Sequence, residues 1–140
     1  MMHPVMTSHR SAFAAALLVA LGIPQAALAT AAPLTGNWAG DRVALSITSR
    51  GARITADCAD GSIDGPLQPD RHGRFRANGN FASHRPGPQL ADETVPAAAA
   101  TRFDGAVAGN TLALTITEPG GVSRKVTLVR NAHLKPVRCL

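Results

Sequence analysis

Histidines are the residues of this chain best suited to acid–base chemistry, and His72, His84 and His133 follow the N-terminal apolar segment. No two of them stand at the short spacing typical of zinc ligands. A histidine beside a carboxylate could move protons, but no serine lies in the G-x-S-x-G elbow of a hydrolase. We therefore interpret the histidines as surface residues, and we expect a protein that is not an enzyme and holds no metal or cofactor.

Three aspartates lie close together in the sequence, at Asp57, Asp60 and Asp64. Calcium loops place carboxylates at alternate positions and end on a bidentate glutamate. Here the spacing is three and then four, and no glutamate follows nearby. Asp60-Gly61 and Asp64-Gly65 are typical turn dipeptides. We therefore interpret this cluster as turn and strand residues rather than as a calcium site.

Arginines could form an anion-binding patch. Arg74 and Arg76 share the polar side of one predicted strand, Arg85 begins a long irregular segment, and Arg102 begins a later strand. If these segments are neighbours, the guanidinium groups could bind phosphate or carboxylate. The alternative is that they form a solvated outer face with no ligand.

The chain has two cysteines, Cys58 and the penultimate residue Cys139. In an oxidising compartment such cysteines pair with each other. The chain-entropy view assigns about 4–5 kcal/mol to the closure of so long a loop. The alternative is a reactive or metal-binding thiol pair, but no C-x-x-C spacing indicates one. We predict a disulfide Cys58–Cys139.

The first 29 residues have the pattern of a secretory signal peptide. Arg10 precedes an apolar run at 12–23, and the A-x-A sequence at 27–29 precedes Thr30. The run is shorter than the roughly 20 apolar residues of a membrane span, although a retained anchor is the alternative. We expect cleavage after residue 29, a mature form without a transmembrane span, and a periplasmic or extracellular location.

Composition limits the choice of partners. The whole chain has a formal charge of +5, and the part after residue 29 keeps 13 basic and 9 acidic residues. Such an excess attracts the chain weakly to anionic surfaces. With one Trp, four Phe and no Tyr, the chain lacks the aromatic platforms of a single-strand binder, and we expect no nucleic-acid partner. Richness in Ala, Arg and Gly fits a bacterial source.

Apolar and polar residues alternate along most of the chain after residue 36, which is the pattern of half-buried strands. Runs of turn residues separate the strands. The pattern predicts an all-β fold, a small antiparallel barrel of about eight strands over 36–140, preceded by a flexible lead-in at 30–35. We expect Ile54, Ala56 and Cys58 to share one strand face.

Two features of this barrel stay open at the level of the sequence. The expected inward positions include many small residues, so the interior could be filled or hollow: Ala44, Ala56, Ala77, Gly79 and Gly105. The stretch 84–100 breaks the alternation with several prolines, and irregular segments of this length are often functional.

Gly36-x-Trp38 at the first predicted strand and Arg130 at the end of the last one resemble the pattern of calycins, the superfamily of lipocalins and avidins. The resemblance implies that Trp38 plugs one end of the barrel and that Arg130 lies over its indole as a cation–π lid. The alternative is a Trp that only fills the core. In either case Trp38 and Arg130 are structural residues.

A second resemblance uses Gly36-x-Trp38 again, with the run from Asp57 to Asp64 (D-C-A-x-G-x-I-D) and the terminal Arg138-Cys139-Leu140. Together these motifs are similar to a group of small exported bacterial single-disulfide β-barrel proteins of unassigned activity. In that group a histidine often stands where this chain has Asp60. The resemblance therefore implies architecture and compartment only.

Together these features predict a non-catalytic binding module for a small ligand in the barrel mouth or for an anionic component of the cell envelope. The alternative is a protein-interaction module, such as an inhibitor of an exported hydrolase that uses the 84–100 segment, or a structural envelope protein.

Overall fold

A computed structural model describes residues 31–84, Gly87, 91–92, 99–135, Val137 and Cys139. The expected signal peptide at 1–29 lies outside the described residues. The strands are β1 (Gly36–Gly40), β2 (Val43–Thr48), β3 (Gly51–Ala56), β4 (Ala59–Asp64), β5 (Arg74–Ser83), β6 (Ala99–Ala108), β7 (Thr111–Thr117) and β8 (Ser123–Arg130).

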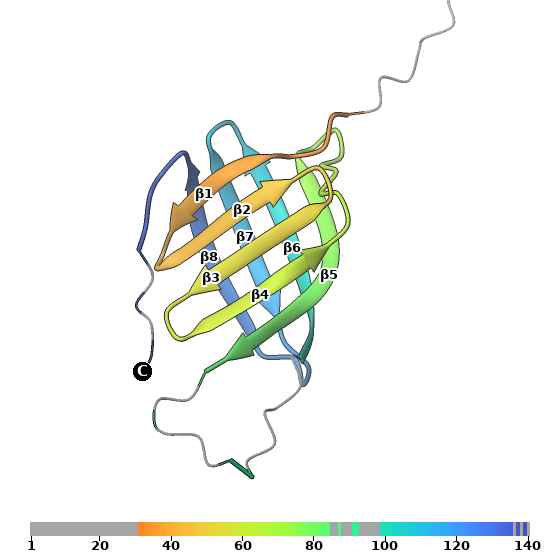
Figure 1. The fold of residues 1–140 in the computed structure, drawn as a ribbon. Coiled ribbons are helices and arrows are strands. Elements are labelled where there is room, and N and C mark those ends of the chain that lie inside the picture. The colour runs from red at the N-terminus through yellow and green to blue at the C-terminus, as the bar shows by residue number, and fades with distance from the viewer. Residues whose placement is uncertain are drawn as a thin grey trace, which may run out of the picture.

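The eight strands form a closed antiparallel barrel in which each strand pairs with the next one in the chain and β8 returns to β1. In Figure 1, β1–β4 run obliquely across the front of the molecule, and β6–β8 pass behind them at a steep angle. The predicted all-β barrel of about eight strands is confirmed. Within the described part of the chain, no helix is long and apolar enough to span a membrane.

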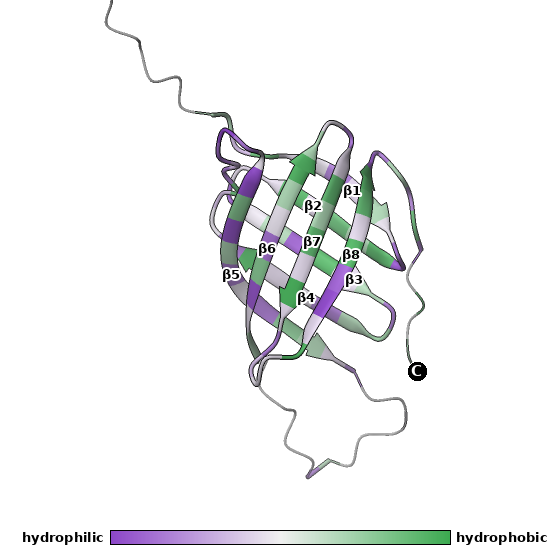
Figure 2. Ribbon diagram, turned by 180° about the vertical axis from the view of Figure 1, so that it is seen from behind, coloured by the Kyte–Doolittle hydropathy of each residue, from purple (hydrophilic) through white to green (hydrophobic). Residues whose placement is uncertain are grey.

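Period-two alternation decides which side chains enter the barrel. On β7, Leu112, Leu114 and Ile116 are buried, and the residues between them face outward. The same alternation colours the strands in bands in Figure 2. Trp38 and Phe103 are among the largest fully buried side chains. Large side chains from all around the barrel therefore fill the interior, as in other small barrels.

The seam between β1 and β8 is the shortest pairing of the sheet. These strands face each other in register only at Trp38–Arg130 and Ala39–Val129. Beyond the register pairs, Thr127 N donates to Asp41 Oδ2 at 2.6 Å. The side chain of Asp41 thus extends the hydrogen bonding that closes the barrel.

β5 curves along its length beside β4 (Figure 1), and two glycines permit this bend. A Cβ on Gly61 would lie 2.1 Å from the carbonyl oxygen of Asn80, and one on Gly79 would lie 2.0 Å from that of Ser62. Both positions point into the barrel, where the two backbones approach most closely. Only a residue without a side chain leaves room for this approach.

Two local expectations are wrong. β3 ends at Ala56, and the β3–β4 turn is Asp57-Cys58, with Cys58 at φ 55°. Cys58 therefore does not share a strand face with Ile54. Asp60-Gly61 lies inside β4 rather than in a turn, because the hairpin closes three residues earlier, at Asp57-Cys58, where the cysteine is bonded to the tail.

Three further expectations change in detail. Ala44 lies between the buried Val43 and Leu45 and faces outward. The irregular stretch ends before β6 begins at Ala99, and only His84, Gly87, 91 and 92 of its connecting part belong to the described residues. In the expected flexible lead-in, Leu34 is buried and its N–H donates to Leu67 O at 2.7 Å.

Substitution of Gly79 by Ala tests the account of the bend. Because the added Cβ meets backbone, the strands must shift, and we expect a loss of about 1–3 kcal/mol in the free energy of unfolding. Asn78→Ala, at the neighbouring exposed position, is the control and should change stability by less than about 0.5 kcal/mol. Chemical denaturation measures both values, and equal stability of the two variants would contradict the account.

Candidate functional site

The C-terminal tail crosses the outer face of the barrel. We call its described residues, 132–135 with Val137 and Cys139, the strap. It begins after β8, where Asn131 N donates to Asn37 O at 2.7 Å. Residues 132–134 then line a shallow depression together with outward residues of β1–β3. In Figure 1 the tail runs along the edge of the barrel beside the end of β1.

The strap ends at the β3–β4 turn in the predicted disulfide Cys58–Cys139, which is confirmed and has a Cα–Cα distance of 5.0 Å. Cys58 N also donates to Val137 O at 3.3 Å. Disulfides persist in oxidising surroundings, so this bond indicates a non-cytoplasmic location. It joins residues 81 positions apart in the sequence and fixes the far end of the strap.

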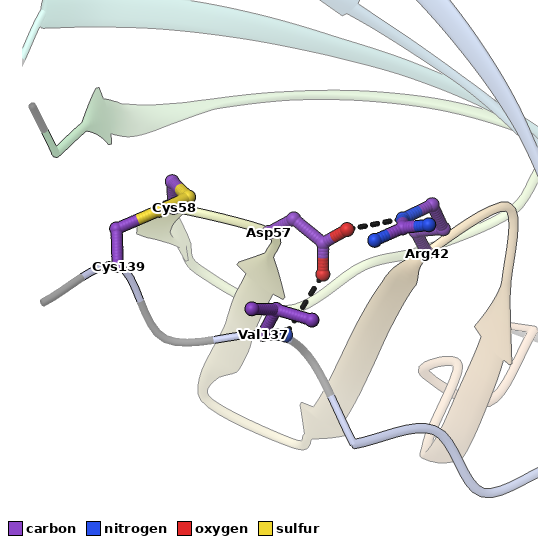
Figure 3. Close-up of a disulfide and its surroundings, with 5 residues drawn as sticks. All are labelled: Arg42, Asp57, Cys58, Val137 and Cys139. Carbon is purple, nitrogen blue, oxygen red and sulfur yellow. Dashed lines mark hydrogen bonds and ion pairs between the residues drawn. A yellow bond between two sulfur atoms is a disulfide. The ribbon is translucent and has the colours of Figure 1, made fainter. Parts of the chain in front are cut away.

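Asp57 reinforces this attachment without being part of the disulfide. Its Oδ1 accepts a hydrogen bond from Val137 N at 2.8 Å, and its Oδ2 pairs with the guanidinium of Arg42 in the β1–β2 turn. Figure 3 shows the carboxylate between these two partners. The hydrogen bond from Val137, followed by that from Arg42, holds the pKa of Asp57 below its ordinary value of 3.8.

Asp57→Asn should therefore lower stability at neutral pH, because the variant loses the charge that attracts Arg42. A depressed carboxylate pKa stabilises the fold above the unfolded value, and the effect is lost as the pH falls through the folded value. The difference in free energy of unfolding between wild type and variant should be constant from pH 7 to about 5 and disappear in stronger acid.

Urea unfolding at several pH values measures this difference. Asp64→Asn is the matched control, since Asp64 lies exposed at the end of β4 and forms no ion pair or side-chain hydrogen bond within the described residues. A difference for Asp57→Asn that grows in acid would contradict the assignment.

Trp38 and Arg130 meet at the other end of the barrel, across the β1–β8 seam. The guanidinium carbon of Arg130 lies 4.3 Å from the centroid of the indole, and its Nη1 donates to Thr35 O at 3.2 Å. Trp38 is 1% exposed, and its Nε1 has no acceptor among the described residues. The pair therefore has the cation–π geometry expected from the G-x-W resemblance.

Arg130→Ala should lower the free energy of unfolding by about 1–2 kcal/mol, because it removes the cation–π contact and a charged hydrogen bond at the seam. Arg130→Lys should lower the free energy of unfolding by less, because the lysine keeps a positive charge near the indole. The single Trp of the chain reports unfolding through its fluorescence. Lys125→Ala, on the exposed side of the same strand, is the control, and a variant Arg130→Ala as stable as this control would refute the role.

The histidines lie in three different places. His72 is in the β4–β5 loop, where Arg71 Nε donates to His72 Nε2 at 3.1 Å, and His133 belongs to the strap. His84 follows β5 at the opposite end and meets Asp60 of β4, with 2.5 Å between Nε2 and Oδ1. The fold thus brings one histidine to one carboxylate of the acidic cluster.

The three aspartates of that cluster do not gather around a common point. Asp57 is in the β3–β4 turn, Asp60 on the outer side of β4, and Asp64 at the far end of that strand. Among the described residues, no group of three His, Cys, Asp or Glu side chains is placed to hold a metal ion.

Basic side chains gather on the outer face of β5–β8. Arg74, Arg76, Arg102 and Lys125 are exposed there, and we call them the cationic face. Strand pairing places Arg76 opposite Asp104 and links Asp104 through Thr115 to Lys125. The hydrophilic bands on β5 and β8 in Figure 2 mark this face. Arg85, the other member of the predicted patch, lies outside the described residues.

One carboxylate lies within the cationic face. Asp104 accepts hydrogen bonds from Arg76 Nε at 2.7 Å and from Arg102 Nε at 2.9 Å. The hydrogen bond from Arg76, and to a smaller extent that from Arg102, holds the pKa of Asp104 below its ordinary value. Asp104 therefore stays ionised and fixes two guanidinium groups side by side, while Arg74 and Lys125 form no ion pair within the described residues.

All other described carboxylates lie elsewhere on the molecule. They occupy β4, the turns and the longer connections: Asp41, Asp57, Asp60, Asp64, Asp70, Asp92 and Glu118. The β5–β8 face thus carries four cations and one carboxylate, and positive charge is concentrated on one side of the barrel.

The sequence interpretation missed several of these residues. Lys125 could have been found, since it lies in phase with the outward residues of its strand. The roles of Asp57, Arg42 and Asp104 had no sequence signal, because each depends on a partner from a distant strand or from the tail.

Comparison with protein-family models, with curated proteins and with solved structures found no match to this chain. The arrangement of the residues themselves therefore supports the functional proposal.

Proposed function

We propose that this chain is an exported, calycin-like, non-catalytic binding module that contacts an anionic component of the cell envelope through its cationic face. The observation that carries the proposal is the concentration of Arg74, Arg76, Arg102 and Lys125 on one face with a single carboxylate among them. Guanidinium groups bind phosphate and carboxylate oxygens through paired hydrogen bonds.

Two features support export and calycin likeness. The disulfide fits a periplasmic or extracellular compartment, as does the signal-peptide pattern at 1–29. The stacking of Arg130 on Trp38 at one end of an eight-stranded barrel fits the calycin pattern.

The outer face suits the role better than the barrel interior. Inward side chains such as Trp38, Phe103 and Leu112 are at most 1% exposed, so a ligand inside the barrel would have to displace packed core residues. The hydrolase-inhibitor alternative depends on the 84–100 segment, most of whose connecting part lies outside the described residues.

Cations near an anionic lipid surface contribute about 1 kcal/mol each. The double variant Arg74→Gln/Lys125→Gln should therefore bind phosphatidylglycerol vesicles roughly 30-fold more weakly than wild type. These two residues are chosen because neither is held by Asp104, so their loss leaves the ion pairs of the face intact.

Co-sedimentation with vesicles at low ionic strength measures the binding. The matched control is Arg50→Gln/Arg53→Gln, which removes the same charge from the β2–β3 hairpin on the other side of the barrel. Equal losses in both double variants would show attraction by net charge alone, and that result, like the absence of binding by wild type, would refute the proposed face.

A further inference from the structure

We propose a second site: the groove under the strap binds a small aliphatic carboxylate, and it exists because the disulfide holds the strap in place. The groove has a volume of about 780 Å³, which is within the range of small-molecule sites. It lies on the opposite side of the barrel from the cationic face. The inference is therefore independent of the proposed function.

Two walls of different origin form this groove. The first wall is the outer side of the β3–β4 hairpin, with Arg53, Thr55 and Asp60, together with His84. The second wall is the strap, with Leu134, Lys135, Val137 and Cys139. Neither wall makes a concave site alone, because each is an exposed surface when the other is removed.

The charges of the walls favour an anion. Arg53 comes from the hairpin and Lys135 from the strap, so each wall supplies one cation. Asp60 is the one carboxylate among the described lining residues. It lies 2.5 Å from His84 Nε2 and is occupied by that contact. The hydroxyl of Thr55 adds a neutral donor. A carboxylate entering the groove therefore meets two cations and a hydrogen-bond donor.

The apolar lining favours an aliphatic group beside that charge. Leu134 and Val137 are 36% and 57% exposed, although large apolar side chains are otherwise mostly buried in the described structure. Both line the groove, together with Ala56 and Ala59. Among the described lining residues there is no Phe, Tyr or Trp, so the apolar part of the ligand would be packed against alkyl groups.

The strap wall depends on its two ends. Asn131 fixes the start of the tail, and the disulfide with the Asp57–Val137 hydrogen bond fixes its end. Without the covalent bond, only a few hydrogen bonds near Cys58 would hold Lys135 and Val137 over the hairpin. The ligand should therefore bind the disulfide-bonded protein and not its Cys58→Ser/Cys139→Ser variant.

Titration with sodium hexanoate, followed by ¹H–¹⁵N NMR, tests the inference. Saturable shifts are expected at Arg53, Thr55, Asp60, Leu134 and Val137 in the wild type. Hexanamide, which has the same chain without the charge, should bind at least tenfold more weakly. The variant Arg53→Gln/Lys135→Gln should also bind hexanoate at least tenfold more weakly than the wild type. Arg50→Gln, in the adjacent turn, should bind hexanoate as tightly as the wild type.

The Cys58→Ser/Cys139→Ser variant separates loss of the site from loss of the fold. Its spectrum should keep the core amides of β6 and β7 near their wild-type positions while the saturable shifts at the groove disappear. Equal binding of hexanoate and hexanamide, undiminished binding by the serine variant, or shifts confined to the β5–β8 face would overturn the inference. If the serine variant is unfolded, the Arg53→Gln/Lys135→Gln result decides.

Discussion

Closure of the barrel between β1 and β8 is the constraint on which the rest of the structure depends. These strands are in register only at Trp38–Arg130 and Ala39–Val129, whereas β5 and β6 pair from Arg74 to Phe81. A barrel avoids exposed sheet edges only if this last pairing holds. The stacking of Arg130 on Trp38 and the hydrogen bond from Thr127 to Asp41 both lie at this seam.

The strap adds a second connection between the two halves of the barrel. The chain leaves β8 beside the seam, passes over the outer sides of β1–β3 and ends in a covalent bond to the β3–β4 turn. Its path joins the last strand to the first half of the barrel by a second route. The same path creates the concave surface on which the proposed carboxylate site depends. The strap therefore contributes both to the stability of the barrel and to the proposed binding site.

The two sides of the barrel are chemically different because the carboxylates are unevenly distributed. On β5–β8, Asp104 is the only carboxylate that faces outward. It fixes the positions of Arg76 and Arg102 but does not cancel the positive charge of the face. On the other side, Asp57 and Asp60 are engaged with Arg42 and His84. One side therefore presents a broad cationic surface, and the other presents a groove with a few specific groups.

The sequence by itself determined the barrel, most of the inward residues and the disulfide. Period-two alternation separates inward from outward side chains without knowledge of their neighbours, and two cysteines leave one pairing. Only the tertiary structure decided which outward residues meet: Asp60 with His84, Asp104 with two arginines, and Asp57 with Val137 of the tail. These contacts depend on strand register and on the path of the strap, and alternation along one strand contains no information about either.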